Sequence, residues 1–354
     1  MRSDPFQELK QYIHQRAAEL GFDGVGFTDV SLNDYTPRLR SWLDNGYHAE
    51  MGWMKQRLAL RADPTKLMEN SVSVISFRIN YLPHDTQPLQ ILKSPEKAYI
   101  SRYALGRDYH KHIRKKLAKI GEEIRDWSDQ EIGIRAFVDS APVLEKPLAE
   151  KAGLGWIGKN TLLLNREAGS WFFLGELITT LPLAEENETA EDHCGKCKAC
   201  LKICPTDAFP KPYQLDARKC ISYLTIEHKG SIPEELRSKM GNRVFGCDDC
   251  QLICPWNRYA KHNEEDDFKP RHQLDSAELV NIFAWNEEEF LRKTAGSPIR
   301  RIGYQRWLRN LAVGIGNGPA SSEALHALES ANTQSELVRE HTHWAIKNLE
   351  TTTP

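Results

Sequence analysis

HCGKCKACLKICP (residues 193–205) and GCDDCQLICP (residues 246–255) are the two stretches that decide how this chain folds. Together with Cys220 they hold all eight cysteines of the 354 residues, between Cys194 and Cys254. The first ten residues, MRSDPFQELK, lack the apolar core of a secretory signal, and the thiols of a cytosolic protein stay reduced. The cysteines therefore favour metal binding over a disulfide framework.

The spacing of the cysteines indicates two four-iron four-sulfur (4Fe-4S) clusters. The first stretch reads C-x2-C-x2-C-x3-C-P, the run of bacterial ferredoxins, in which the fourth cysteine binds the other cluster. The second run departs from this pattern because Cys220 lies 27 positions before Cys247, which indicates an insertion. The C-x2-C pairs alone would also permit two four-cysteine zinc sites. We expect one cluster on Cys194, Cys197, Cys200 and Cys254, and the other on Cys204, Cys220, Cys247 and Cys250.

Composition predicts a water-soluble globular protein with no membrane partner. Apolar residues make up 40% of the chain and charged residues 27%, near the averages of soluble domains. No stretch approaches the roughly 18 apolar residues of a membrane span, so we expect a cytoplasmic protein. At this length roughly two or three domains are expected. Because the net charge is −2, a nucleic-acid partner must be met by a local basic surface.

Hydrophobic periodicity before the cysteine stretches predicts strands that alternate with helices. Apolar runs of strand length lie at residues 24–27, 72–77 and 134–139. Apolar residues at spacings of three and four over residues 113–124 predict a helix before the last of these strands. The alternation indicates an N-terminal α/β part in a chain that is α+β as a whole.

Two polar runs without periodicity divide the chain. They are LAEENETAED (183–192) and AKHNEEDDFKPRHQ (260–273). From residue 277 onward the pattern is helical and resembles a short HEAT-like repeat. We therefore expect an N-terminal catalytic domain (1–185), an inserted ferredoxin-like module with both clusters (186–262) and a HEAT-like helical domain (263–354).

Several segments together resemble one family of enzymes. They are SRYALGRDYHKHIRKKL (101–117), VDSAPVLEKPLAEKAGLGWIGKNTLLLN (138–165), HCGKCKACLKICPTDAF (193–209), KCISYLTIEHKGSIP (219–233) and FGCDDCQLICPWN (245–257). The combination covers nearly the whole chain and resembles epoxyqueuosine reductases, relatives of the corrinoid reductive dehalogenases. The resemblance implies reduction of the epoxide of epoxyqueuosine to the alkene of queuosine at the wobble position of tRNA, the last step of queuosine biosynthesis. It also implies cobalamin beside the two clusters and an external low-potential electron donor, and we expect a monomer.

Asp139, at the end of the strand at 134–139, is the residue that the resemblance makes the proton donor. On the residues alone, an aspartate in Asp-Ser-Ala-Pro is expected to cap the backbone N–H groups of a turn. For Asp139 to act as an acid near neutral pH, its site must hold the proton, which burial away from cations would promote. His110 and His112 are expected behind the site or at the surface, because the family binds cobalamin without a histidine ligand.

The glycine-rich segment GLGWIGKN (153–160) fits G-x-G-x-x-G, but it does not follow a strand directly, so we do not expect a dinucleotide site. The segment is either a plain turn or a place where glycine lets the backbone approach a flat macrocycle. Arg57 in WMKQR is also typical of a solvated helix face. The resemblance implies a corrin pocket surrounded by Arg57, Tyr103, Asp139, Gly158, Asn160, Ser222 and Asp248.

A basic stretch lies at residues 291–310, which contain six basic residues and no acidic one, with Tyr304 and Trp307 among them. Such a cluster is typical of phosphate binding, and the unstacked bases of an anticodon loop can stack on aromatic rings. The alternative is a solvated helix face with Trp307 turned into the core. The resemblance favours tRNA contact, which we expect at Lys229, Arg300, Arg301, Arg306 and Arg309.

Two other functions stay open from the sequence. A corrinoid dehalogenase of small organohalides predicts a twin-arginine signal and no basic helical tail, the reverse of what these residues show. A ferredoxin-type electron carrier needs no catalytic centre, and it would not need about 185 residues before its cysteines. A visible spectrum after anaerobic purification separates a carrier from the others, because a carrier has no corrin bands.

Overall fold

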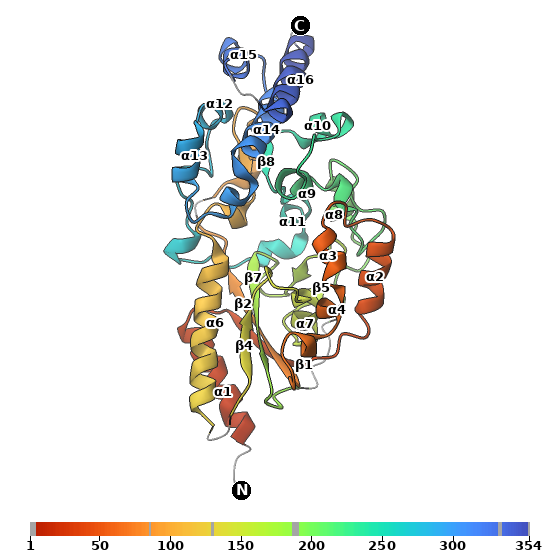
Figure 1. Ribbon diagram of the computed structural model, residues 1–354, viewed down its shortest axis with the longest axis vertical. Coiled ribbons are helices and arrows are strands. Elements are labelled where there is room, and N and C mark those ends of the chain that lie inside the picture. The colour runs from red at the N-terminus through yellow and green to blue at the C-terminus, as the bar shows by residue number, and fades with distance from the viewer. Residues whose placement is uncertain (1–4, 85, 129–130, 186–190, 332–334, 353–354) are drawn as a thin grey trace.

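The computed structural model describes residues 5–84, 86–128, 131–185, 191–331 and 335–352. Part of the linker predicted at 183–192 therefore lies outside the described residues. Figure 1 shows an elongated molecule with a sheet toward the N-terminal end, helices toward the C-terminal end and the cysteine-bearing segments between them. Of the helices that the described residues form, none is long and apolar enough to cross a membrane.

A four-stranded sheet forms the centre of the N-terminal half. Its order is β1 (Gly24–Asp29), β2 (Ser73–Asn80), β7 (Phe172–Thr179) and β4 (Ile134–Phe137). The first, second and fourth of these confirm the three predicted strands, whereas β7, between β2 and β4, was not predicted. Every neighbouring pair is antiparallel, so the sheet is of the α+β kind and not the parallel kind that α/β alternation implies.

Helices cover both faces of this sheet (Figure 1). On one face, α1 (Pro5–Glu19) and α6 (Tyr109–Asp126) pack through apolar residues at helical spacing, which confirms the predicted helix. On the other face, α7 (Glu145–Lys151) packs against β2 and β7. In β7, a Cβ at Gly175 would lie 2.7 Å from Leu117 Cδ1, so glycine lets α6 lie close to the strand.

Short elements complete the first two thirds of the chain. In the N-terminal half they are α2 (Thr36–Asp44), α3 (Gly52–Gln56), α4 (Leu58–Ala62), η1 (Pro64–Lys66), α5 (Pro88–Leu92), β3 (Tyr99–Ile100), η2 (Arg102–Ala104), β5 (Trp156–Ile157) and β6 (Leu163–Leu164). Among and after the cysteines they are α8 (Ala199–Ile203), η3 (Ala217–Lys219), α9 (Ile221–Ile226), α10 (Glu234–Met240), β8 (Arg243–Phe245), α11 (Asp249–Leu252) and η4 (Pro255–Tyr259).

The C-terminal helices share their core with a segment of the N-terminal half. Strand β3 pairs in parallel with β8, and Ile100 and Leu105 are buried among the residues of these helices. The pairing fixes the loop after β3 against a cysteine-bearing segment, and this junction positions the site. The C-terminal elements are η5 (Asp266–Phe268), α12 (Leu279–Phe283), α13 (Glu287–Lys293), η6 (Pro298–Ile302), α14 (Gly303–Gly316), α15 (Ser322–Glu329) and α16 (Glu336–Thr352).

Candidate active site

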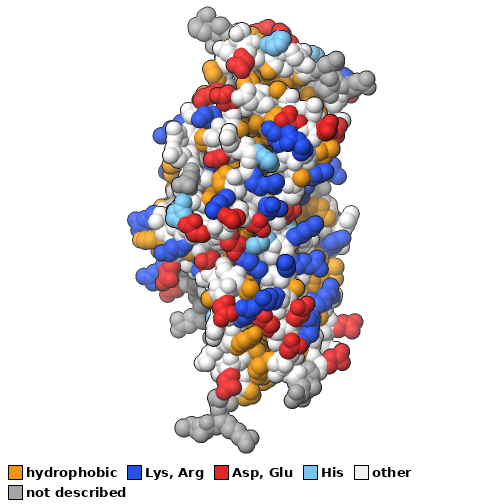
Figure 2. All heavy atoms as spheres, turned by 90° about the vertical axis from the view of Figure 1, so that its left-hand side faces the viewer, with side chains coloured by type: hydrophobic (Ala, Val, Ile, Leu, Met, Phe, Trp, Pro, Cys, Tyr) orange, Lys and Arg blue, Asp and Glu red, His pale blue; other side chains and the backbone are white. Residues whose placement is uncertain are grey.

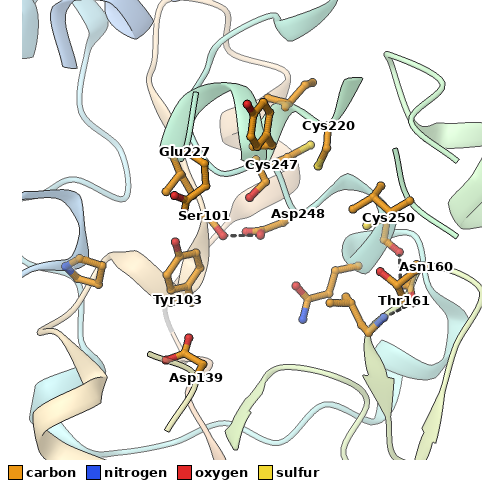
Figure 3. A pocket seen from close by; sticks show the side chains of 18 of the residues that line it. Ser101, Tyr103, Asp139, Asn160, Thr161, Cys220, Glu227, Cys247, Asp248 and Cys250 are labelled. Atoms are coloured by element: carbon orange, nitrogen blue, oxygen red, sulfur yellow. Dashed lines mark hydrogen bonds between the residues drawn. The ribbon is translucent and has the colours of Figure 1, made fainter. Parts of the chain in front are cut away.

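A cavity of about 820 Å³ lies where the sheet, the cysteine-bearing segments and the start of the C-terminal helices meet. Figure 3 shows Asp139 on one side of it, and Cys247, Asp248 and Cys250 on another. Its volume is toward the upper end of the roughly 300–1,000 Å³ that ligand pockets span. The cavity therefore has room for a large ligand beside the cysteines.

The eight cysteines fall into two sets. Cys254 lies with the first cysteine run, although it is distant in sequence, and Cys204 lies with the second. Crossed ligation requires this exchange of the fourth cysteine. Asn160 lines both cavities, and its Nδ2 donates to the Cys250 carbonyl oxygen at 3.1 Å, so the two sets are neighbours. Cys194, Cys197, Cys200 and Cys254 line a cavity of about 240 Å³, and Cys204, Cys220, Cys247 and Cys250 line the large cavity.

Burial raises the pKa of thiols in both sets. It raises the pKa of Cys200 to about 11 and those of Cys247 and Cys250 well above the ordinary value. Among the described residues, no group of His, Cys, Asp or Glu is tight enough to hold a single metal ion. A coordinated metal removes the proton from a thiol outright, and four thiolates hold each 4Fe-4S cluster. Four cysteines around a space fit a cluster in number and chemistry.

Asp139 follows β4 and is held by two side chains from the start of α6. Its Oδ1 lies 2.7 Å from His110 Nε2, and its Oδ2 accepts a hydrogen bond from the Tyr109 hydroxyl. Tyr109 is fixed in turn, because its ring stacks on that of Phe173 in β7 with centroids 3.8 Å apart. Asp139 keeps 37% of its side-chain exposure and lines the cavity (Figure 3). These contacts hold a carboxyl group in a defined position at the cavity wall.

His110 places a positive charge beside Asp139. Burial alone would lower the pKa of this imidazole, but hydrogen bonds to Asp108 and Asp139 outweigh burial and raise it to about 10. At neutral pH His110 is therefore a cation in contact with Asp139, whereas a site without a cation would have helped Asp139 to hold its proton. His110 also lines the cavity, and its side chain is 27% exposed. The sequence analysis considered His110 within the segment DYHKH, but its contact with Asp139, 29 positions away, cannot be predicted from sequence spacing.

Asp248 centres a second polar cluster, between Cys247 and the loop after β3. Its backbone lies in the left-handed region, with φ of 64°. Its Oδ1 accepts a hydrogen bond from Ser101 Oγ at 2.5 Å (Figure 3), and its Oδ2 accepts from the Tyr99 hydroxyl at 2.9 Å and the Arg102 N–H at 2.8 Å. Burial raises its pKa. The cluster joins the second cysteine set to the cavity wall.

Most residues predicted to surround a corrin line this cavity, but two do not. Gly158 is buried, and a Cβ there would lie 2.5 Å from Leu164 Cδ1, so glycine serves the packing of β5 against β6 and not the approach of a ligand. Arg57 is exposed between α3 and α4 and is not among the lining residues. The predicted residues that line the cavity are Tyr103, Asp139, Asn160, Ser222 and Asp248.

Arg309 cannot contact tRNA, which makes the prediction for this residue wrong. It is fully buried, and its guanidinium donates to the carbonyl oxygens of Leu224, His228 and Gly230. Burial lowers its pKa to about 9. Arg306 is partly buried and donates to the Ile226 carbonyl oxygen at 2.9 Å. Both side chains tie α14 to α9 and the segment after it.

The other basic residues are accessible. Arg300 and Arg301 line the cavity, where Arg301 pairs with Glu227 at 2.6 Å, and Lys229 is exposed. Trp307 is fully buried, which confirms the alternative that it turns into the core. On the face that Figure 2 shows, Lys and Arg side chains are interspersed with Asp and Glu.

Two neighbouring four-cysteine sets beside a large cavity with a positioned acid define an iron-sulfur oxidoreductase. Residues 193–257 match the family of 4Fe-4S double cluster binding domains, and residues 61–140 match the family described as epoxyqueuosine reductase QueG, DUF1730.

The relatives narrow the class to one family. The epoxyqueuosine reductase of Pseudomonas aeruginosa is 58% identical over 340 residues, which are 96% of this chain and 94% of that protein. The epoxyqueuosine reductase of Escherichia coli K12 is 56% identical over 339 residues, 96% of this chain and 89% of that protein. A crystal structure of epoxyqueuosine reductase with an epoxyqueuosine-modified tRNA-Tyr stem loop aligns with a TM-score of 0.89 at 28% identity, over 97% of this chain and 91% of that one. The chain belongs to the epoxyqueuosine reductase family.

Proposed function

We propose that this chain reduces the epoxide of epoxyqueuosine in tRNA to the alkene of queuosine, the last step of queuosine biosynthesis. The observation that carries the proposal is the large cavity, whose walls hold one four-cysteine set and Asp139 with its partners Tyr109 and His110. Conversion of an epoxide to an alkene takes up two electrons and two protons and releases the oxygen as water. Clusters on the cysteines would deliver the electrons, and Asp139 would deliver a proton. The relative solved with a modified tRNA stem loop supports the substrate.

Cobalamin is the cofactor that we place in the large cavity. The volume suits a large ligand, and the walls carry an aromatic ring, hydroxyl groups and an amide in addition to the second cysteine set. When bound, cobalamin would supply a cobalt centre able to donate electrons to the substrate. The residues that would hold it are Tyr103, Asn160, Ser222 and Asp248.

Electrons enter from an external low-potential donor and reach the cavity through the two clusters. Cys197 is exposed, which puts the first set within reach of a donor at the surface. The second set lines the cavity and is joined to the first through Asn160. Clusters held on these two cysteine sets would supply the two electrons of one turnover.

Asp139 passes to the leaving oxygen the proton that His110 holds at neutral pH. The imidazolium of His110 touches Asp139 Oδ1, and the Tyr109 hydroxyl holds Oδ2, so the acid is both oriented and supplied. One relative, from Bacillus subtilis, was solved with its catalytic aspartate loop swung out of the active site, which supports a catalytic role for Asp139 after β4.

The tRNA binds where the C-terminal part meets the cavity. Arg300 and Arg301 lie at the wall and contact phosphate together with Lys229, while Arg306 donates to the Arg301 carbonyl oxygen at 3.0 Å and supports that position. The protein acts as a cytoplasmic monomer. We divide it into a cobalamin-binding catalytic domain (1–185), a cluster module (186–262) and a HEAT-like tRNA-binding domain (263–354).

The proposal is tested in a bacterium that lacks its own epoxyqueuosine reductase and accumulates epoxyqueuosine in tRNA. Expression of this chain should convert the modified nucleoside to queuosine, measured by mass spectrometry of digested tRNA. Persistent epoxyqueuosine, in cells whose purified protein contains iron and cobalamin, would contradict the proposal.

A further inference from the structure

The proposed reaction needs a second proton besides the one that Asp139 passes on from His110. Both carbon–oxygen bonds of the epoxide break, and the oxygen leaves as water, so two protons and two electrons enter for each alkene formed. The contact between Asp139 and His110 accounts for one proton. A second acid within the site would complete the supply, and this inference rests on the proposed function.

Glu145 is placed to be that acid. It is the first residue of α7, and it lines the same cavity as Asp139. Its Oε2 is buried and has no hydrogen-bond partner among the described residues. A buried carboxylate without a partner destabilises the folded state, and the neutral form of the group lowers that cost.

Glu176 extends the same arrangement into the protein. It is fully buried on β7, on the sheet face that α7 covers, and neither of its carboxyl oxygens has a partner among the described residues. Ser76, opposite Glu176 in the strand register, also has a buried hydroxyl without a partner. Carboxyl and hydroxyl groups without partners therefore lie both at the cavity wall and on the sheet face that α7 covers.

Burial favours the protonated form of Glu145. Burial, followed by the charge of Asp139, raises its pKa to about 8, although Lys146, His110 and Arg61 act in the opposite direction. Burial lowers the pKa of Lys146. Because the charge of Asp139 contributes to this shift, the protonation states of the two carboxyl groups are linked.

We propose that Glu145 stores the second proton of the reaction and passes it to Asp139 within each turnover, with Glu176 as a buried reserve behind it. Asp139 first passes the His110 proton to the epoxide oxygen, and the Glu145 proton then reaches Asp139 and completes the water molecule. Glu145 acts through Asp139, and the glutamates recover their protons from solvent when the product leaves.

The test compares Glu145→Gln with Glu150→Gln in the enzyme loaded with clusters and cobalamin. Glu150 lies on the same helix, but its oxygens accept hydrogen bonds from the Ile157 N–H and the Tyr35 hydroxyl, so it controls for the loss of a glutamate from α7. Glu145→Gln should lower kcat about a hundredfold at pH 7, the lower end of what a general acid contributes. The wild-type kcat should fall as pH rises through about 8, the pKa of Glu145, and the variant should lose this dependence.

Infrared difference spectra read the stored proton without turnover. The carbonyl band of a protonated carboxyl group should disappear from the wild type as pH rises through about 8, and Glu145→Gln should lack that change. Near-native kcat in Glu145→Gln, or an unchanged infrared titration, overturns the proposal. If the glutamine variant does not fold, Glu145→Asp keeps a carboxyl group and should retain both signals. A wild type that shows the infrared band but forms no queuosine would instead refute the proposed function.

Discussion

Replacement of Asp139 by asparagine separates proton delivery from electron delivery. An asparagine keeps the size of the side chain, and its carbonyl oxygen can still accept the hydrogen bond from the Tyr109 hydroxyl. The amide cannot release a proton as a carboxylic acid does. The contact at 2.7 Å with His110 also changes, because an uncharged amide no longer stabilises the imidazolium.

The loss should fall on turnover and leave the cofactors in place. A general acid typically contributes about 10² to 10⁴ in rate, so kcat should fall within that range. No hydrogen bond or ion pair of the described residues joins Asp139 to a cysteine, so iron content should stay native. The pKa of His110 should fall from about 10, because one of the two carboxylates that raise it is gone, while the contact with Asp108 remains.

The assay follows queuosine formation with anaerobically reconstituted enzyme and epoxyqueuosine-containing tRNA, together with iron content and the visible spectrum. Tyr109→Phe is the matched control: it removes one hydrogen bond to Asp139, worth about 0.5–1.5 kcal/mol, and keeps the ring on Phe173, so the rate should fall about tenfold or less. Near-native epoxide reduction by Asp139→Asn would refute the reasoning and leave Asp139 as a turn residue.

Three further predictions concern the clusters, the arginines and pH. Cys200→Ser and Cys254→Ser should disturb the same cluster, read by electron paramagnetic resonance, whereas damage by Cys254→Ser to the cluster of Cys247 and Cys250 would contradict the crossed arrangement. Arg309→Ala should destabilise the fold by several kcal/mol in denaturant unfolding, because a buried guanidinium that donates to three carbonyl oxygens is lost. Arg301→Glu should leave stability near native, weaken tRNA binding and flatten its salt dependence. The reverse pattern would exclude our placement of the tRNA. The folded-state pKa of His110, about 10, lies above its ordinary value of roughly 6.5, so its stabilising contribution is complete below pH 6.5 and is lost as pH rises through 10. The difference in Tm between wild type and His110→Gln should therefore shrink over that range, and a difference that grows with pH would be inconsistent with a charged His110.

Local sequence signals located the strands, the long helix and the cysteine sets, because each depends on spacing within one segment. The strand β7 was not predicted, although it lies inside the sheet. Its sequence, FFLGELIT, carries Gly175 and Glu176 in the middle, which interrupt an apolar run. The structure explains the glycine by the close approach of α6, and Glu176 by its burial under α7.

The failures at the site arise where burial decides the role of a charged or small residue. Arg309 and Arg301 look alike in a basic stretch, but one donates to three backbone carbonyl oxygens inside the protein and the other lines the cavity. Gly158 belongs to a glycine-rich segment, yet its neighbour is Leu164. His110 acquires its high pKa only from two carboxylates, one of which lies 29 positions away. Sequence spacing predicts where a residue lies along a helix or strand, but it does not predict the long-range contacts that the residue makes in the folded protein.

The most direct test of the account counts electrons against product in one reaction. Purified enzyme with about eight irons per chain, loaded with cobalamin and kept anaerobic, is given epoxyqueuosine-containing tRNA and a measured amount of a chemical reductant. The account predicts one queuosine for every two electrons consumed, and no product when cobalamin is left out. Product formation without cobalamin, or reductant consumed with the epoxide intact, would contradict it.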